Sequence, residues 1–253
     1  MTARLDLAMQ LDEWCQNLDH SMQVLHHFNT IAWPPETLDS MRWSIILSIH
    51  YYFTFLLINA PVLTIALAES KKHWPLDAPS STFQDATKHV LRSDFEAAKK
   101  LQTLIHGLHS FGGPFIDSNA IWFLCNYSTF TISLHAFGLL LYLTSLKHSA
   151  AGVDLSTEEV RKLLNDSLES LRLVGRTSLM SQKARKCLLR FLDFFDSMTF
   201  EEDVFNQQTR PSNFSGDDMN MGSGSLTLPV EEHLPDFDFS QFITDAADEF
   251  LFQ

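Results

Sequence analysis

Two long stretches without a charged side chain constrain the fold of this 253-residue chain more than any other feature. The first covers residues 43–68 and the second covers residues 119–146, and neither contains Asp, Glu, Lys or Arg. A helix of this length is long enough to cross a bilayer, but a helix buried on all sides in a helical domain has the same composition. The two stretches therefore predict two long apolar helices, either in a membrane or in a protein core.

The residues within and around these stretches favour the protein core. Trp43 and Trp74 flank the first stretch roughly as an interfacial belt would, which fits a membrane. However, the stretches also contain polar residues, among them His50, Asn59 and His135. The amphipathic helices expected around them also need a shared apolar partner. A soluble core is the preferred interpretation, and the alternative is a membrane protein with two spans, residues 43–68 and 119–146, and an acidic tail.

Apolar side chains recur at helical spacing in the rest of the first 199 residues. Gly112-Gly113-Pro114 is a helix stop, and Ser156 with Glu159 has the spacing of a capping box at a helix start. No βαβ alternation, hairpin signal or repeat appears, so the predicted class is all-α, a multi-helix globular domain with a disordered acidic C-terminal tail. The expected apolar faces are Leu7, Leu11, Trp14 and Leu18; Phe83, Ala86, Val90, Ala97, Leu101, Leu104 and Leu108; Val160, Leu163, Leu164, Leu168 and Leu171; and Ala184, Cys187, Leu188, Phe191, Leu192 and Phe195.

The distribution of charge predicts a domain boundary near residue 200. The chain carries a formal charge of −13, and residues 200–253 hold 12 acids and a single base, Arg210, which gives −11. The same segment is rich in Gly, Ser, Asn and Pro, a composition that cannot bury enough apolar surface to offset the entropy of folding. We therefore expect a helical domain over residues 1–199 and a flexible acidic tail over residues 200–253.

The sequence gives no signal for catalysis, a metal or nucleic-acid binding. Phosphate loops, nucleophile elbows, dinucleotide fingerprints and zinc-protease motifs are all missing, so we expect no enzyme and no cofactor. Cys15, Cys125 and Cys187 form no CxxC pair, and His106 with His109 lacks further ligands at a suitable spacing. The negative net charge argues against direct binding to nucleic acid. The first residues lack the apolar core of a signal peptide, so a reducing intracellular compartment is expected.

The acidic tail carries the clearest binding signal. Acids alternate with aromatic residues around residues 234–242, and the mixture returns at residues 248–252. The acids keep such a segment in water, while the rings can be buried in a groove lined with basic residues on a partner protein. This pattern is typical of a transcriptional activation segment, and the alternative is a solubilising tail. The expected partner-binding residues are Phe237, Phe239, Phe242, Phe250, Leu251 and Phe252.

Four stretches of the first 199 residues resemble the regulatory "middle homology" domain of fungal zinc-cluster transcription factors. Leu11-Asp-Glu-Trp14-Cys-Gln-Asn-Leu18 is similar to an early helix of that family, and residues 49–63 resemble its most recognisable stretch, an aliphatic-aromatic helix that ends in a proline. Residues 95–101 and 184–192 resemble two later helices. The resemblance spans roughly residues 5–198, and within residues 49–63 it depends on Tyr51, Leu56, Leu57, Ile58, Pro61 and Leu63.

The sequence departs from this family in two places. Asn59 and Ala60 stand where family members often have a His-Arg pair, and the six-cysteine zinc cluster that reads DNA in the family is not present. The chain is then either a piece of a longer factor or a version without its own DNA reader. The resemblance implies a nuclear regulator of RNA polymerase II genes that contacts transcriptional coactivators or other regulators, with homo- or hetero-oligomerisation left open, and that contacts neither DNA nor a membrane itself.

Overall fold

Every regular element in the described part of the chain is a helix, which confirms the predicted all-α class. The computed structural model describes residues 2–26, 38, 40–70, 81–111, 119–145, 155–174 and 178–208. Apart from a short 3₁₀ helix, η1 (His20–Met22), its elements are α1 (Thr2–Gln16), α3 (Arg42–Ser70), α4 (Ser81–Phe111), α6 (Asn119–Ser145), α7 (Thr157–Val174) and α8 (Leu179–Gln208).

The chain divides into two compact units, Met1–Phe191 and Leu192–Gln253. Helix α8 runs to Gln208 and therefore passes through the boundary predicted at residue 200. The flexibility predicted for the acidic tail concerns residues that lie, after Gln208, outside the described part of the chain. The packing described below belongs to the first unit.

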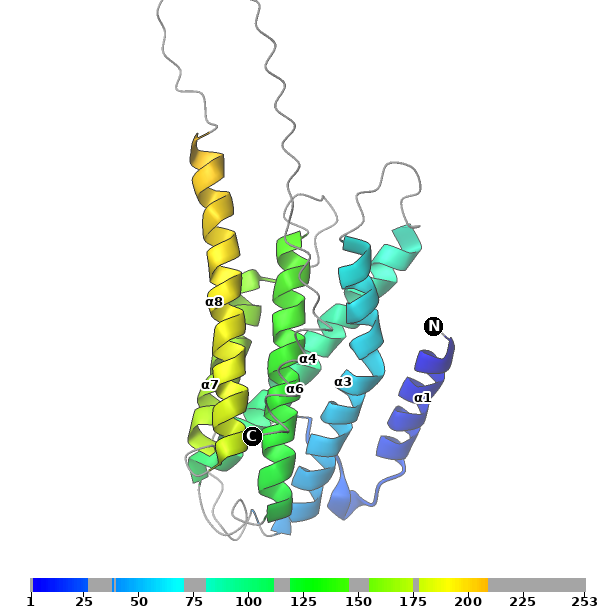
Figure 1. Cartoon of the computed structure of the whole chain (residues 1–253). Helices are drawn as coiled ribbons and strands as arrows, with labels where there is room; N and C mark the ends of the chain where they lie inside the picture. Colours follow the sequence, from blue (N-terminus) through cyan, green and yellow to red (C-terminus); the bar gives the residue numbers. More distant parts are fainter. Residues whose placement is uncertain are drawn as a thin grey trace, which may run out of the picture. The chain divides into compact units, whose positions relative to one another are not determined.

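Helices α3, α4 and α6 form the centre of the first unit. Helix α4 packs against α3, α6 and α7, and α6 also packs against α3 and α7. Helix α3 lies between α1 and α6 (Figure 1). Phe53 of α3 contacts Tyr127 of α6, and Leu63 lies against Gly138, so the two helices run in parallel. The two charge-free stretches are thus adjacent helices of one unit.

Polar residues at the helix termini explain where two of the helices start. The Ser156 hydroxyl accepts a hydrogen bond from the Glu158 amide at 3.2 Å, which caps α7. Ser178 caps α8 in the same way, with its hydroxyl 3.3 Å from the Ser181 amide. Helix α4 ends at Phe111, and the predicted stop, Gly112-Gly113-Pro114, lies outside the described residues.

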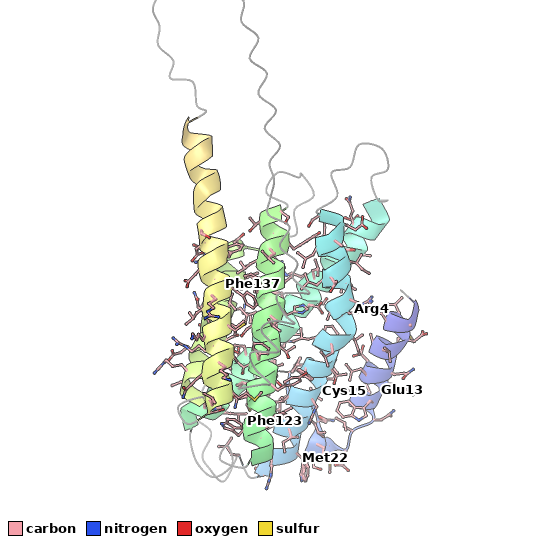
Figure 2. All side chains as sticks on the ribbon, viewed as in Figure 1. Arg4, Glu13, Cys15, Met22, Phe123 and Phe137 are labelled. Atoms are coloured by element: carbon pink, nitrogen blue, oxygen red, sulfur yellow. The ribbon has the colours of Figure 1, made fainter. Side chains whose placement is uncertain are left out.

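The predicted apolar faces agree with the structure to different degrees. All five residues of the α7 face are buried. On α4 the second half of the predicted face is buried, whereas Ala86 is exposed. On α8, Phe191 is buried and stacks on Phe137 with 5.0 Å between ring centroids. Phe137 lies on α6 (Figure 2). Helix α1 differs most, since Leu7 and Trp14 are 49% and 37% exposed.

Pro61 lies inside α3, which continues for nine residues to Ser70. The resemblance implied a helix that ends at this proline, and that expectation is wrong. Proline lacks the amide that would bond to the carbonyl four residues earlier, but its ring is exposed here. Burial of Val62, Leu63 and Ala66 in the next two turns keeps the chain helical beyond it.

Candidate functional site

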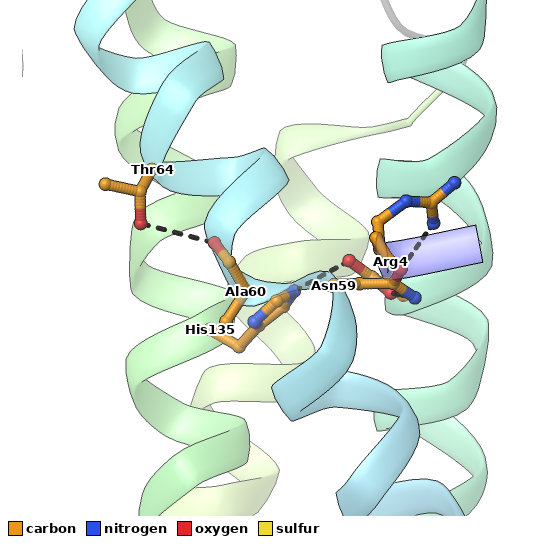
Figure 3. Close-up of polar contacts among 6 residues, drawn as sticks. Arg4, Asn59, Ala60, Thr64 and His135 are labelled. Atoms are coloured by element: carbon orange, nitrogen blue, oxygen red, sulfur yellow. Dashed lines mark hydrogen bonds and ion pairs between the residues drawn. The ribbon is translucent and has the colours of Figure 1, made fainter. Parts of the chain in front are cut away.

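Four polar side chains from four helices meet inside the first unit (Figure 3). Asn59 of α3 donates a hydrogen bond from Nδ2 to Oδ1 of Asp94 on α4, at 2.7 Å. Arg4 of α1 donates from Nη1 to Oδ1 of Asn59, at 2.6 Å. Nε2 of His135 on α6 lies 3.4 Å from Oδ2 of Asp94. We call Arg4, Asn59, Asp94 and His135 the buried polar cluster.

The cluster lies on the apolar faces of its helices. Asn59, Asp94 and His135 are 1%, 0% and 6% exposed. Each follows a buried apolar residue by three positions: Leu56, Leu91 and Ile132 in turn. Because residues three or four positions apart share a helix face, the burial of these apolar neighbours places the polar groups in the core.

Burial dominates the electrostatics of Asp94. Loss of water around the carboxylate raises its pKa, while His135, Asn59 and Arg4 oppose this shift. Oδ1 accepts the bond from Asn59, whereas Oδ2 faces Nε2 of His135 at 3.4 Å, a separation near the outer limit of a hydrogen bond. The cluster therefore contains a carboxylate whose charge is only partly compensated.

The cluster has the parts of an acid–base pair but not the surroundings of a catalytic site. An Asp–His pair activates a nucleophile when a third group lies within hydrogen-bond reach of the imidazole. Here both side chains are buried among apolar residues of three packed helices. The contacts instead connect α1, α3, α4 and α6, so the arrangement supports a structural role.

Two further polar contacts connect other helices of this unit. Gln102 of α4 donates from Nε2 to the Ser170 hydroxyl of α7 at 2.7 Å and accepts from the Ser167 hydroxyl at 3.2 Å. The Ser181 hydroxyl of α8 donates to Oδ1 of Asn126 on α6 at 2.6 Å. Such buried bonds fix which residues of two helices face each other, because a shift along the helix would leave polar groups unpaired.

Cys125 and His109 are buried, and burial disfavours the charged form of each. Burial raises the pKa of Cys125 to about 12, which keeps the thiol protonated and unreactive. Burial, with a smaller contribution from His106, lowers the pKa of His109 to about 4. Among the described residues, no group of three or more His, Cys, Asp or Glu side chains is placed to hold a metal.

A second notable feature is an apolar surface on α3 and α6. Leu57 and Ile65 of α3 are 48% and 50% exposed, and Phe123 and Tyr127 of α6 are 53% and 45% exposed. Tyr127 stacks on Phe123 and contacts Phe53, so its ring joins the two helices. We call these five residues the α3/α6 face.

Both helices are also long and apolar enough to cross a membrane by length and composition. The most apolar segment of α3 is 33% buried inside the protein, and that of α6 is 67% buried. Core helices of soluble proteins pass the same test, so these values do not by themselves distinguish a core from a membrane.

The partner-binding residues predicted in the tail all lie outside the described part of the chain: Phe237, Phe239, Phe242, Phe250, Leu251 and Phe252. The buried polar cluster was not predicted. Asn59 and His135 stood out as polar residues in the apolar stretches, but Asp94 was not singled out, although it is a carboxylate that follows a buried leucine by three positions. Comparison with protein-family models, curated proteins and solved structures finds no match.

Proposed function

We propose that this chain is the regulatory part of a fungal zinc-cluster type transcription factor. It acts in the nucleus through contacts with other proteins, and the acidic tail provides those contacts. The helical first unit is the folded platform, and the DNA reader is supplied by another part of the factor or by a partner. No catalytic step, cofactor or direct contact with nucleic acid is part of this proposal.

The observation that carries the proposal is the position of the four family-like stretches. They fall in chain order on α1, α3, α4 and α8, in the regions 11–18, 49–63, 95–101 and 184–192. The first two stretches are in contact, because the Tyr51 hydroxyl donates to Oδ1 of Asp12 at 3.0 Å. Asn59, where the sequence departs from the family, bonds to Asp94 and Arg4 and so has a defined place in the core.

The surroundings of α3 and α6 favour this proposal over the membrane alternative. Helix α4 packs against both helices, and Asp94 at its middle touches Asn59 and His135. Within one turn of Asp94, Arg92 and Glu96 each have side chains 46% exposed. A bilayer around α3 and α6 would draw these charges towards the hydrocarbon, at a cost of about 2.5–3.5 kcal/mol for each charged side chain at the centre.

A reporter assay with the whole chain fused to an unrelated DNA-binding domain tests the proposal. The fusion should activate a reporter gene that carries the matching promoter element. Replacing Phe237, Phe239 and Phe242 by alanine should remove most of this activity. The physical reason is that each ring buried on a partner contributes about 1.5–3 kcal/mol.

The matched control replaces Phe200, Phe205 and Phe214 by alanine, because it removes the same number of rings from the acidic segment. This control should keep most of the activity. Equal activity of the parent and the Phe237/Phe239/Phe242 variant would show that these rings are not the contact. A fusion without activity, although present in the nucleus, would contradict the assignment as an activator.

A further inference from the structure

The α3/α6 face consists of apolar side chains like those of a protein core, but most of these side chains are about half exposed. The residues 43–68 and 119–146 carry no formal charge, so the face has no ion that must stay in water. Two threonine hydroxyls beside it are bonded within their own helices. Thr64 donates to the carbonyl of Ala60 at 3.2 Å, and Thr131 donates to that of Tyr127 at 3.0 Å. A partner can therefore cover these threonines without breaking their hydrogen bonds, whereas the phenol hydroxyl of Tyr127 needs water or an acceptor at the edge of the interface.

The face is large enough to hold two proteins together. Leu57, Ile65, Phe123 and Tyr127 are each about half exposed, which leaves on the order of 400 Å² of apolar surface given the size of such side chains. Patches of this size on a monomer are often binding sites. Part-exposed side chains continue the surface along α6, at Phe130, Leu134 and Leu141. Together they approach the roughly 600 Å² that each partner contributes at the lower end of standard interfaces.

The pattern along α3 points to a helix as the occupant. Its exposed positions include Trp43, His50, Leu57 and Thr64, which recur every seven residues. This spacing is typical of a helix that packs lengthwise against another helix. Exposed small residues nearby, Pro61 and Ala68, leave room for a close approach.

A second copy of the chain meets these requirements best. The occupant must be helical, apolar and free of charge, and α3 and α6 of another copy are such helices. A net charge of −13 makes copies of the chain repel one another, and this repulsion is weakest at a surface without charges, such as the α3/α6 face. The acidic tail is a poor occupant, because the face offers no basic residue to its carboxylates. We propose that two copies associate through the α3/α6 face, with a two-fold axis that places the face of one chain on the same face of the other.

The mass of the full chain in solution tests this proposal, by sedimentation velocity over a wide range of protein concentration. The wild type should show twice the mass of one chain and should dissociate on dilution. The double substitution Leu57→Glu and Tyr127→Glu should weaken association roughly thirtyfold or more, because it buries like charges at the centre of the interface. Circular dichroism should show the same helical content as the wild type, since both side chains are about half exposed.

Two further samples make the test specific. The control Met9→Glu with Leu179→Glu places the same charges on α1 and α8, where these side chains are 69% and 62% exposed, and it should remain dimeric. A second double variant, Leu57→Lys with Tyr127→Lys, should be monomeric alone. Mixed with the glutamate variant, it should restore the dimer, because opposite charges then face each other.

Several results would overturn the proposal. The first is a wild type that is monomeric at every concentration, and the second is a glutamate variant that stays dimeric. The third is a glutamate variant that loses its helical content, because this would mean that the chain itself covers the face. Flotation of the wild type, but not of the glutamate variant, with phosphatidylcholine vesicles would assign the face to lipid instead. The proposal does not depend on the activity of the tail, so its failure would leave the reporter assay unaffected.

Discussion

At the scale of single residues, Asp94 of the buried polar cluster contributes to the way the stability of the first unit depends on pH. Burial makes the charged form of Asp94 costly, and this raises its pKa above the ordinary value even though His135, Asn59 and Arg4 favour the carboxylate. The folded protein therefore binds a proton at Asp94 more readily than the unfolded chain does. Between the ordinary pKa and the raised one, the contribution of Asp94 to stability falls as the pH rises.

We expect Asp94→Asn to remove this part of the pH dependence. The amide is neutral at every pH, so the stability of the variant should not show the decline that deprotonation of Asp94 causes in the wild type. The free energy of unfolding of the wild type minus that of the variant should thus decrease as the pH rises from about 4 towards the raised pKa. Urea denaturation over this pH range measures the difference.

The control is Asp85→Asn on the same helix, where the carboxylate is 74% exposed. It makes the same chemical change at an exposed position, so the comparison shows whether an altered pH dependence comes from the buried site or from the substitution itself. If the free energies of unfolding of the wild type and of Asp94→Asn differed by the same amount at every pH, the carboxylate would not bind a proton more readily in the folded state. The description of the buried polar cluster would then be wrong.

At the scale of elements, two glycines in helices differ in what surrounds them. A Cβ at Gly107 of α4 would meet no other atom within 4 Å, whereas a Cβ at Gly138 of α6 would lie 2.9 Å from Cδ2 of Leu63. Glycine in a helix interior costs about 0.5–1 kcal/mol relative to alanine. An alanine at Gly107 should therefore stabilise α4 by this amount. At Gly138 the missing side chain allows α3 and α6 to approach closely.

Substitutions at the two glycines should change stability in opposite directions. Gly107→Ala should increase the free energy of unfolding by about 0.5–1 kcal/mol. Gly138→Val should decrease it by about 1–3 kcal/mol, because the added methyl groups overpack the contact with Leu63. Chemical denaturation of both variants under one condition checks the pair. A stabilising Gly138→Val would show that α3 and α6 are not packed as described.

The same scale shows what the sequence could predict. The α7 face was predicted fully, because one strong amphipathic period and one cap define that helix without reference to others. The buried face of α1 was predicted wrongly. Arg4 reaches Asn59 in the core, whereas the predicted Leu7 and Trp14 are exposed. The meeting of Asn59 with Asp94 depends on how two helices pack, and spacing along one helix carries no information about that. Pro61 was misjudged because burial in the following turns outweighs a local helix-breaking preference.

At the scale of the whole molecule, the apolar helices and most of the negative charge lie in different parts of the sequence. Residues 200–253 carry −11 of the net charge of −13, so residues 1–199 are close to neutral. A near-neutral chain with an exposed apolar face is prone to association. In the proposed dimer, the acidic segments of the two copies repel one another, so we expect association only where apolar contact outweighs this repulsion, as at the charge-free α3/α6 face.

The chain as a whole should be recovered in the soluble fraction without detergent, and its circular dichroism should be strongly helical. The reason lies in α4, which packs on both apolar helices and exposes Arg92 and Glu96 near its middle. Charges at that level are stable in water and costly in hydrocarbon. Cell fractionation followed by circular dichroism measures both properties. A chain found only in membranes, and extracted only by detergent, would mean that α3 and α6 are spans, and the nuclear regulator would have to be abandoned in favour of the membrane alternative.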